Sequence, residues 1–180
     1  SETVFQPTAA GRVVALSAAD GEPRWRVSTD RGLVTTPALD DGGLLLANEN
    51  RVVQSLGLSD GRQQWGVETV ARGGGACPPA LANGLVYTGG ADGLVHGLSV
   101  TTGTAHWELR LPEAITSGLA VADGRAFVAA GRRVYAADAS RVPGASDTPA
   151  GVAAATRKPV WSRRLAAPSA PPSPSRDARG

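Results

Sequence analysis

Residues 93–107 read Gly-Leu-Val-His-Gly-Leu-Ser-Val-Thr-Thr-Gly-Thr-Ala-His-Trp, and this frame recurs along the chain. Residues 11–25 and 51–65 also end in a tryptophan that follows a glycine by four positions. When the three stretches are aligned without a gap, further columns match: Leu16 with Leu56 and Leu98, and Val13 with Val53 and Val95. Agreement at this many columns indicates an internal repeat of about 40 residues, which must be recognised before the fold is assigned.

Each repeat is expected to form an antiparallel sheet of three strong strands and a weaker fourth. In the third repeat the strong strands are residues 85–89, 94–100 and 106–111. An Asp-Gly or Thr-Gly pair precedes the third strand of each of the first three repeats, and such pairs suit tight turns because glycine tolerates positive φ. The weaker strands, expected to close the first three sheets, are residues 37–39, 79–81 and 118–121.

The fourth repeat is altered. Phe127-Val128 is aligned with Val86-Tyr87, and residues 134–138 with 95–99, so two residues are missing from the turn between them. Small and helix-breaking residues then predict an exposed loop insertion at 141–157 before Trp161. The predicted propeller region is 1–165, with repeats at about 2–41, 42–83, 84–123 and 124–165. The Pro/Ser/Ala-rich tail, 166–180, is expected to be disordered or extended.

Composition excludes several classes of protein. The net charge of +2 is too small to indicate nucleic-acid binding, and no apolar run approaches the roughly 20 residues that cross a bilayer. Cys77 is the only cysteine, so it cannot form an internal disulfide or a cysteine-based zinc site. No secretory leader is visible from Ser1 onward, and we expect a leader or an anchor outside this stretch of sequence.

Sheets of this size must pack face to face, because one sheet of about 40 residues cannot shield both of its faces. One tryptophan per repeat can bury roughly 200 Å² between neighbours. The pattern therefore predicts an all-β chain of four-stranded propeller blades. A WD40 propeller is disfavoured, since no tryptophan is followed by aspartate; the residues that follow are Arg26, Gly66, Glu108 and Ser162. Kelch repeats are disfavoured because the glycine doublets do not share a column.

Residues 15–25 fit the frame Ala-x-Asp-x-x-Thr-Gly-x-x-x-Trp, with serine in place of its aspartate and aspartate in place of its threonine. Residues 97–107 keep Thr-Gly and the tryptophan, and residues 136–138 keep the initial Ala-x-Asp. This frame resembles the tryptophan-docking repeat of the pyrroloquinoline-quinone-like (PQQ-like) β-propeller family over about residues 2–165. The resemblance implies a ring of seven or eight blades. We therefore expect either further sequence or the association of two chains through their open end faces.

Proteins of the resembling family fall into three groups: quinone-dependent dehydrogenases, outer-membrane assembly lipoproteins, and extracytoplasmic propellers attached to bacterial serine/threonine kinases. The dehydrogenases hold their quinone with two adjacent cysteines and a calcium ion, whereas Cys77 has no neighbouring cysteine. Glu49, flanked by Asn48 and Asn50, could offer oxygen ligands to calcium, but a polar turn is the favoured interpretation.

The remaining candidate residues do not assemble a catalytic site. His96 and His106 align with other residue types in the neighbouring repeats, so a role at the surface or between blades is favoured over catalysis. The glycine run 73–75 lacks the Gly-Lys-Ser/Thr of a phosphate loop and is interpreted as a connection. Arg132-Arg133 and Arg163-Arg164 are interpreted as solvated charges that discourage sheet-to-sheet aggregation, in preference to a phosphate site.

The sequence thus predicts a non-catalytic bacterial propeller that binds a protein or small ligand on a scaffold surface, at the periplasmic or extracellular face of a membrane. We assign no catalytic, cofactor-binding or metal-binding residue and expect no cofactor. The alternative is a fragment of a PQQ-dependent dehydrogenase. Neither the ligand, nor the total blade number, nor an attached kinase domain or lipid anchor can be read from these residues.

Overall fold

A computed structural model describes residues 2–8, 10–29, 35–48, 52–69, 77–139 and 155–165, and its regular structure in these ranges is entirely β. The first two sheets contain β1 (Thr3–Thr8), β2 (Arg12–Ser17), β3 (Pro23–Ser28), β4 (Ala38–Leu39), β5 (Leu44–Ala47), β6 (Val52–Leu56) and β7 (Gln63–Glu68). The other two contain β8 (Ala80–Ala82), β9 (Leu85–Gly89), β10 (Leu94–Ser99), β11 (Ala105–Arg110), β12 (Ile115–Ala122), β13 (Arg125–Ala130), β14 (Arg133–Asp138), β15 (Ala155–Arg157) and β16 (Trp161–Arg164). No helix in the described part of the chain could span a membrane.

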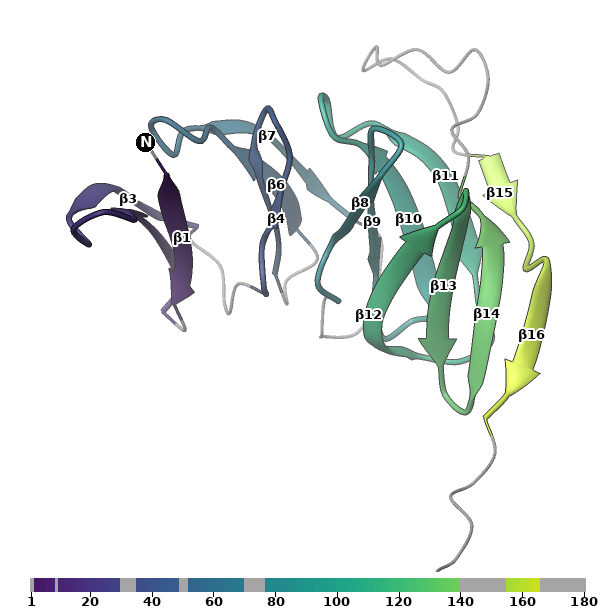
Figure 1. The fold of residues 1–180 in the computed structure, drawn as a ribbon. Coiled ribbons are helices and arrows are strands. Elements are labelled where there is room, and N and C mark those ends of the chain that lie inside the picture. Colours follow the sequence, from purple (N-terminus) through teal and green to yellow (C-terminus); the bar gives the residue numbers. More distant parts are fainter. Residues whose placement is uncertain are drawn as a thin grey trace, which may run out of the picture.

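Four sheets follow one another in chain order, with the first and the fourth at opposite ends of the row (Figure 1). The strand orders are β1-β2-β3, β4-β5-β6-β7, β15-β11-β10-β9-β8 and β12-β13-β14-β16. Every pairing is antiparallel except that of β15 with β11. The predicted all-β fold of serial antiparallel sheets is confirmed.

The sheets are offset from the repeats that the sequence predicted. The weaker strand expected to close one sheet pairs instead with the first long strand of the next, as β4 does with β5, β8 with β9, and β12 with β13. The reason is local. Asn83 and Gly84 both have positive φ, 54° and 70°, so they form a tight turn that folds β8 directly onto β9. Asp123 and Gly124 do the same between β12 and β13.

The fourth sheet corrects the predicted alignment by one residue. The Phe127 ring lies 6.1 Å from that of Trp161, just as Phe5 lies 5.6 Å from Trp25 and Tyr87 lies 5.5 Å from Trp107. Phe127 therefore occupies the column of Tyr87 rather than that of Val86. The difference matters because a slip of one residue moves every side chain of a strand to the opposite face.

The predicted loop insertion at 141–157 is not wholly a loop. Its last three residues form β15, which lies parallel to β11 with Ala155 opposite Trp107. Backbone pairing with an exposed sheet edge thus overrides the turn-forming composition of this segment. Residues 140–154, and the tail expected to be disordered at 166–180, lie outside the described residues.

Three apolar clusters fill the spaces between successive sheets. Leu44 and Leu46 of β5 pack with Val13 toward the first sheet, while Leu45 and Ala47 of the same strand pack with Val86 toward the third. One strand thus supplies two cores through its alternating faces, which explains why residues 44–47 read as an unbroken apolar run. The third cluster joins the third and fourth sheets and includes Trp107 and Val128.

Candidate functional site

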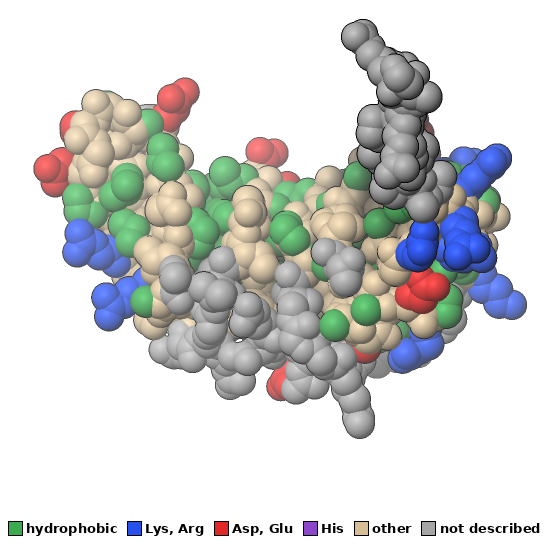
Figure 2. Space-filling view, turned by 90° about the horizontal axis from the view of Figure 1, so that it is seen from below, with side chains coloured by type: hydrophobic (Ala, Val, Ile, Leu, Met, Phe, Trp, Pro, Cys, Tyr) green, Lys and Arg blue, Asp and Glu red, His purple; other side chains and the backbone are tan. Residues whose placement is uncertain are grey.

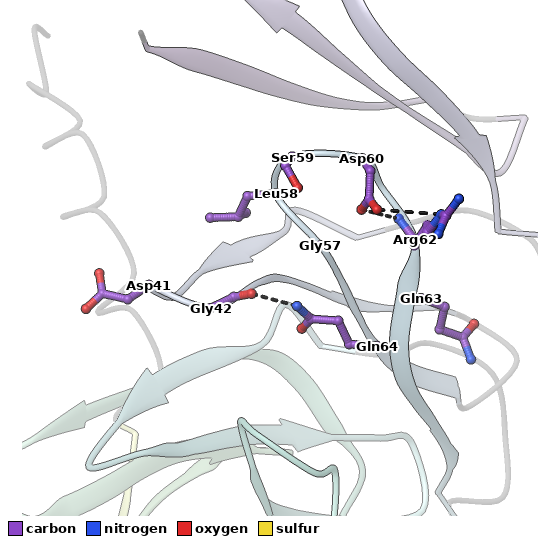
Figure 3. A pocket seen from close by; sticks show the side chains of 9 residues that line it. All are labelled: Asp41, Gly42, Gly57, Leu58, Ser59, Asp60, Arg62, Gln63 and Gln64. Carbon is purple, nitrogen blue, oxygen red and sulfur yellow. Dashed lines mark hydrogen bonds and ion pairs between the residues drawn. The ribbon is translucent and has the colours of Figure 1, made fainter.

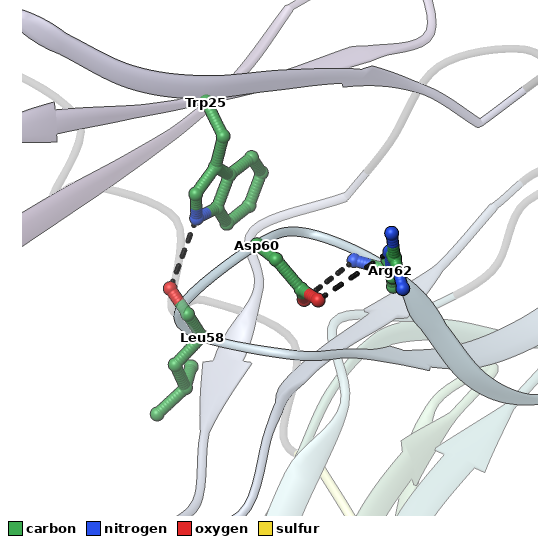
Figure 4. Close-up of polar contacts among 4 residues, drawn as sticks. All are labelled: Trp25, Leu58, Asp60 and Arg62. Atoms are coloured by element: carbon green, nitrogen blue, oxygen red, sulfur yellow. Dashed lines mark hydrogen bonds and ion pairs between the residues drawn. The ribbon is translucent and has the colours of Figure 1, made fainter.

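Two tryptophans, Trp25 and Trp65, each connect one sheet to a turn of the next, and Figure 4 shows the first of these contacts. The indole Nε1 of Trp25 donates a hydrogen bond of 2.9 Å to the carbonyl oxygen of Leu58. A Cβ atom added to Gly61, whose φ is +69°, would lie 2.7 Å from Cε3 of Trp25. Only glycine therefore lets the ring approach this turn.

The next interface repeats this contact. The indole of Trp65 donates a hydrogen bond of 2.8 Å to the carbonyl oxygen of Val100. Gly103 has a φ of +73°, and a Cβ atom there would lie 2.6 Å from Trp65 Cε3. These side chains serve the packing between sheets, so they are not available as a stacking platform for a ligand.

The interface between the third and fourth sheets is built differently. Trp107 is fully buried, but its Nε1 has no hydrogen-bond partner among the described residues. The hydroxyl of Tyr87 instead donates a hydrogen bond of 2.6 Å to the carbonyl oxygen of Ala139, where the insertion begins. Among the described residues, this interface is thus joined by a tyrosine hydrogen bond and not by the tryptophan hydrogen bond of the two preceding interfaces.

A groove of about 390 Å³ lies beside the turn between β6 and β7 (Figure 3). Its lining residues are Asp41, Gly42, Gly57, Leu58, Ser59, Asp60, Arg62, Gln63 and Gln64. Gln64 is held in place, since its Nε2 donates to the carbonyl oxygen of Gly42 at 2.9 Å and its Oε1 accepts from the Ser55 hydroxyl at 2.8 Å. Apart from Leu58 and the two glycines, the residues that line the groove carry polar or charged side chains.

Asp60 and Arg62 form the rim of this groove. The Asp60 carboxylate accepts a hydrogen bond of 3.0 Å from the backbone N–H of Arg62, and its other oxygen lies 3.6 Å from the Arg62 Nε. Both side chains are largely exposed, so solvent screens their attraction. The pair therefore shapes the turn more than it stabilises the fold, and its charges remain open to a partner.

A second groove, of about 370 Å³, is rich in arginine. It is lined by Glu113, Gly131, Arg132, Arg133 and Arg164. A Glu113 oxygen accepts a hydrogen bond of 3.2 Å from the backbone N–H of Arg132, so this carboxylate holds the β13–β14 turn. Three arginines among the five lining residues favour an acidic ligand. Figure 2 shows basic side chains gathered toward the two ends of the molecule, with mainly uncharged ones between them.

The two histidines lie inside the third sheet. His96 on β10 is 3% exposed, and its Nδ1 lies 3.3 Å from Oε1 of Glu108 on β11. Burial lowers the pKa of His96, while the charges of Glu108 and Asp92 oppose that shift. His106 is also buried. Neither imidazole opens onto either groove, so the structure gives them positions between sheets and not on the surface.

Cys77 is buried at the entry to the third sheet, with its sulfur 3.9 Å from the carbonyl oxygen of Ile115. Burial raises the pKa of this thiol, which disfavours the reactive thiolate. Within the described ranges, no three His, Cys, Asp or Glu side chains gather as metal ligands would. Asn48 accepts a hydrogen bond of 3.0 Å from the backbone N–H of Val52, as a turn residue does.

The remaining sequence candidates fall in two groups. Glu49, Asn50 and the glycine run 73–75 lie outside the described residues. Of the two arginine doublets, Arg132-Arg133 and Arg164 line the arginine groove. The sequence indicated these residues, but it did not predict that they lie around one groove. The groove at Gln64 was missed altogether. No motif marks it, because it is shaped by two turns that are distant in sequence.

Comparison with known proteins places this geometry in a family. The family described as outer membrane protein assembly factor BamB (PQQ_2) matches residues 1–177. The chain belongs to this family. The prediction of a PQQ-like β-propeller repeat protein is thereby confirmed.

Individual relatives cover the chain less completely. BamB of Yersinia pestis is 31% identical over 104 residues, which are 56% of this chain and 26% of that protein. BamB of Moranella endobia is 27% identical over 115 residues, or 61% and 29% of the two chains. The quinohemoprotein alcohol dehydrogenase ADH-IIG of Pseudomonas putida is 30% identical over 94 residues, which are 47% of this chain and 13% of that protein. The match thus spans less than a third of each of these relatives.

Solved structures agree on the fold. BamB from Moraxella catarrhalis superimposes with a TM-score of 0.69 and 22% identity, covering 77% of this chain and 46% of that one. The computationally designed Ika8 protein gives a TM-score of 0.65 with 15% identity, covering 77% and 43%. At these identities the likeness shows the β-propeller fold and nothing further.

Proposed function

We propose that this chain is a non-catalytic scaffold domain that binds protein partners at the periplasmic face of a bacterial membrane, in the manner of an assembly factor. The observation that carries the proposal is the match to the BamB family over residues 1–177. The two grooves support it, since they offer hydrogen-bonding and cationic groups at the surface. Charged rims and turn surfaces of this kind are suited to binding proteins.

Within this proposal, the arginine groove receives an acidic segment of the partner. Arg132, Arg133 and Arg164 supply three cations, and guanidinium groups bind carboxylates in a paired geometry that lysine cannot reproduce. Glu113 accepts from the backbone N–H of Arg132, and the Arg133 guanidinium donates one hydrogen bond of 3.3 Å to the Ser162 hydroxyl. The remaining guanidinium N–H groups are the ones that we assign to the partner. The sensor domain of a receptor kinase would use the same surfaces and differs only in what is attached.

Photocrosslinking tests the proposal in the cell envelope. A photoreactive side chain at Arg132 should give adducts with outer-membrane assembly proteins, and the same side chain at Arg12, exposed on the first sheet, should give fewer. Arg164→Glu should weaken the Arg132 adducts because it reverses one charge of the groove. Equal adducts from both positions, insensitive to Arg164→Glu, would refute a binding role for this groove.

A fragment of a quinone-dependent dehydrogenase is the disfavoured alternative, because the dehydrogenase match covers only 13% of that protein. Titration of the purified chain with pyrroloquinoline quinone and calcium, followed by tryptophan fluorescence, separates the two functions. We expect no saturable quenching at micromolar quinone. Saturable quenching would favour the dehydrogenase.

A further inference from the structure

The two regular contacts between sheets follow one rule. The tryptophan of one sheet donates to the carbonyl that stands seven positions before the tryptophan of the next sheet, as Trp25 does to Leu58 and Trp65 does to Val100. Its ring also covers the positive-φ glycine that stands four positions before that tryptophan. Each such interface therefore pairs one indole with one glycine turn that has no side chain in the way of the ring.

The first sheet carries a glycine turn that no indole covers in the described part of the chain. Gly21 has a φ of +75°, close to those of the two covered glycines, but a Cβ atom added to it would meet nothing within 4 Å. Ala18, at the position equivalent to Leu58 and Val100, is exposed. The backbone of this turn already has the conformation that receives a tryptophan at the other interfaces.

The fourth sheet carries an indole that no glycine turn covers among the residues that the structure describes. Trp161 is 38% exposed, whereas Trp65 is 9% exposed and Trp107 is fully buried. Trp161 lies opposite Ala136 and against the ring of Phe127, the same placement on its sheet that Trp25 has with Ala15 and Phe5. Val160 and Leu165 beside it are also exposed, at 56% and 48%.

Charge supports a pairing of these two ends. The residue two positions after the tryptophan, Val27 or Val67, also touches the glycine turn at the existing interfaces. At the free end this residue is Arg163, and the free turn holds Asp20 and Glu22 on either side of Gly21. Seating Trp161 on Gly21 would bring Arg163 next to two carboxylates, an opposite-charge pairing that favours this register over others.

We propose that two copies of this chain join head to tail into a closed ring, with Trp161 of each copy seated on the Gly21 turn of the other. The complementary surfaces lie at opposite ends of the row of sheets (Figure 1), so the contact is between unlike faces, and two such contacts close a twofold assembly. The chain covers 46% of the BamB propeller from Moraxella catarrhalis, so two copies supply close to the length of one such chain.

Light scattering after size exclusion tests the proposal on the purified 180-residue chain. We expect twice the monomer mass in the micromolar range. Trp161→Ala and Gly21→Ala should each weaken association at least tenfold, because each removes one half of both contacts. Gly84→Ala is the matched control: Gly84 has a similar φ of +70° and open space around it, but lies in the β8–β9 turn away from both ends, so this variant should remain a dimer.

Mixing the two defective chains gives the decisive result. Gly21→Ala keeps the indole and Trp161→Ala keeps the glycine turn, so one intact contact forms and a heterodimer should appear when one chain is labelled. A monomeric parent chain at 100 µM or open polymers would overturn the ring. So would an unchanged dimer of Trp161→Ala, or a mixture that stays monomeric although each variant melts as a folded protein.

Discussion

Trp65 and Gly103 show how single residues determine the spacing of the sheets. The indole is held by a hydrogen bond to Val100 and lies over a glycine that has no side chain to displace it. Packing and hydrogen bonding thus converge on one side chain, and the same pair recurs at Trp25 and Gly61. Glycine is needed at this position for two reasons: it adopts the positive φ without strain, and its lack of a side chain lets the ring approach closely.

Trp65→Ala should lower the free energy of unfolding by about 3–5 kcal/mol, the usual loss when a large buried aromatic is truncated. Trp65→Phe is the matched variant, because it keeps most of the ring and removes the donor to Val100. It should cost clearly less, with about 1 kcal/mol from the hydrogen bond. Chemical denaturation measures both. If Trp65→Ala unfolds at the same denaturant concentration as the parent, the packing role is wrong.

His96 should make the fold sensitive to mild acid. Burial lowers its pKa in the folded chain below the ordinary value of 6.5, so the unfolded chain takes up a proton first as the pH falls. The stability associated with the neutral imidazole is therefore present above about pH 6.5 and is lost below it. Glu108 and Asp92 reduce this loss, and Arg110 adds to it.

His96→Gln tests this dependence directly. Gln54 occupies the same position in the second sheet and is buried there, so the substitution suits the strand. The free energy of unfolding, measured from pH 7.5 to pH 5, should fall less steeply in the variant than in the parent. Parallel curves would show that the imidazole does not titrate differently in the folded and unfolded chains.

At the scale of strands and turns, the hairpin turns decide which sheet a strand joins. Asn83-Gly84 and Asp123-Gly124 fold β8 and β12 onto the strands that follow them, so each repeat shares a strand with the next sheet. The sequence contained this signal, since Asn-Gly and Asp-Gly between apolar runs predict a hairpin. The sequence prediction followed the repeat boundaries instead, and it therefore placed these strands in the preceding sheets.

The sequence predicted the strongly repeated strands but not the elements that depend on contacts between distant segments. The repeat revealed the three strong strands of each sheet because tryptophan, leucine and valine recur at fixed spacing. The alignment of Phe127 slipped by one residue, since two apolar neighbours fit either column and only the contact with Trp161 distinguishes them. β15 and both grooves depend on contacts between distant segments, which no local pattern encodes.

Gly103→Ala should test the turn that receives Trp65. The new Cβ atom would lie 2.6 Å from the indole, so the ring must move or the turn must change, in addition to the strain of a positive φ. We expect a loss of about 2–5 kcal/mol, the sum of backbone strain and overpacking. Gly84→Ala carries the strain alone and should cost about 1–2 kcal/mol. Equal losses of the two variants in thermal or chemical unfolding would show that the contact between the new Cβ atom and Trp65 costs nothing.

At the scale of the whole molecule, the sheets differ in how completely they are covered. The second and third sheets have a neighbour on each side, and β5, β9 and β10 are buried along their whole length. The first and fourth sheets have one neighbour each, and β16 is exposed throughout. Repeat arrays gain their stability from nearest-neighbour interfaces, so the end sheets should open at a lower free energy than the central ones.

Hydrogen exchange followed by mass spectrometry should therefore show a gradient along the chain. Amides of β5, β9 and β10 should exchange slowest, and those of β1 and β16 fastest, because opening an end sheet breaks one interface whereas opening a central sheet breaks two. The experiment uses Trp161→Ala, so that pairing of the ends between chains does not protect the outer sheets. Uniform protection across all four sheets would mean that the row unfolds as one cooperative unit, and nearest-neighbour additivity would then fail for this propeller.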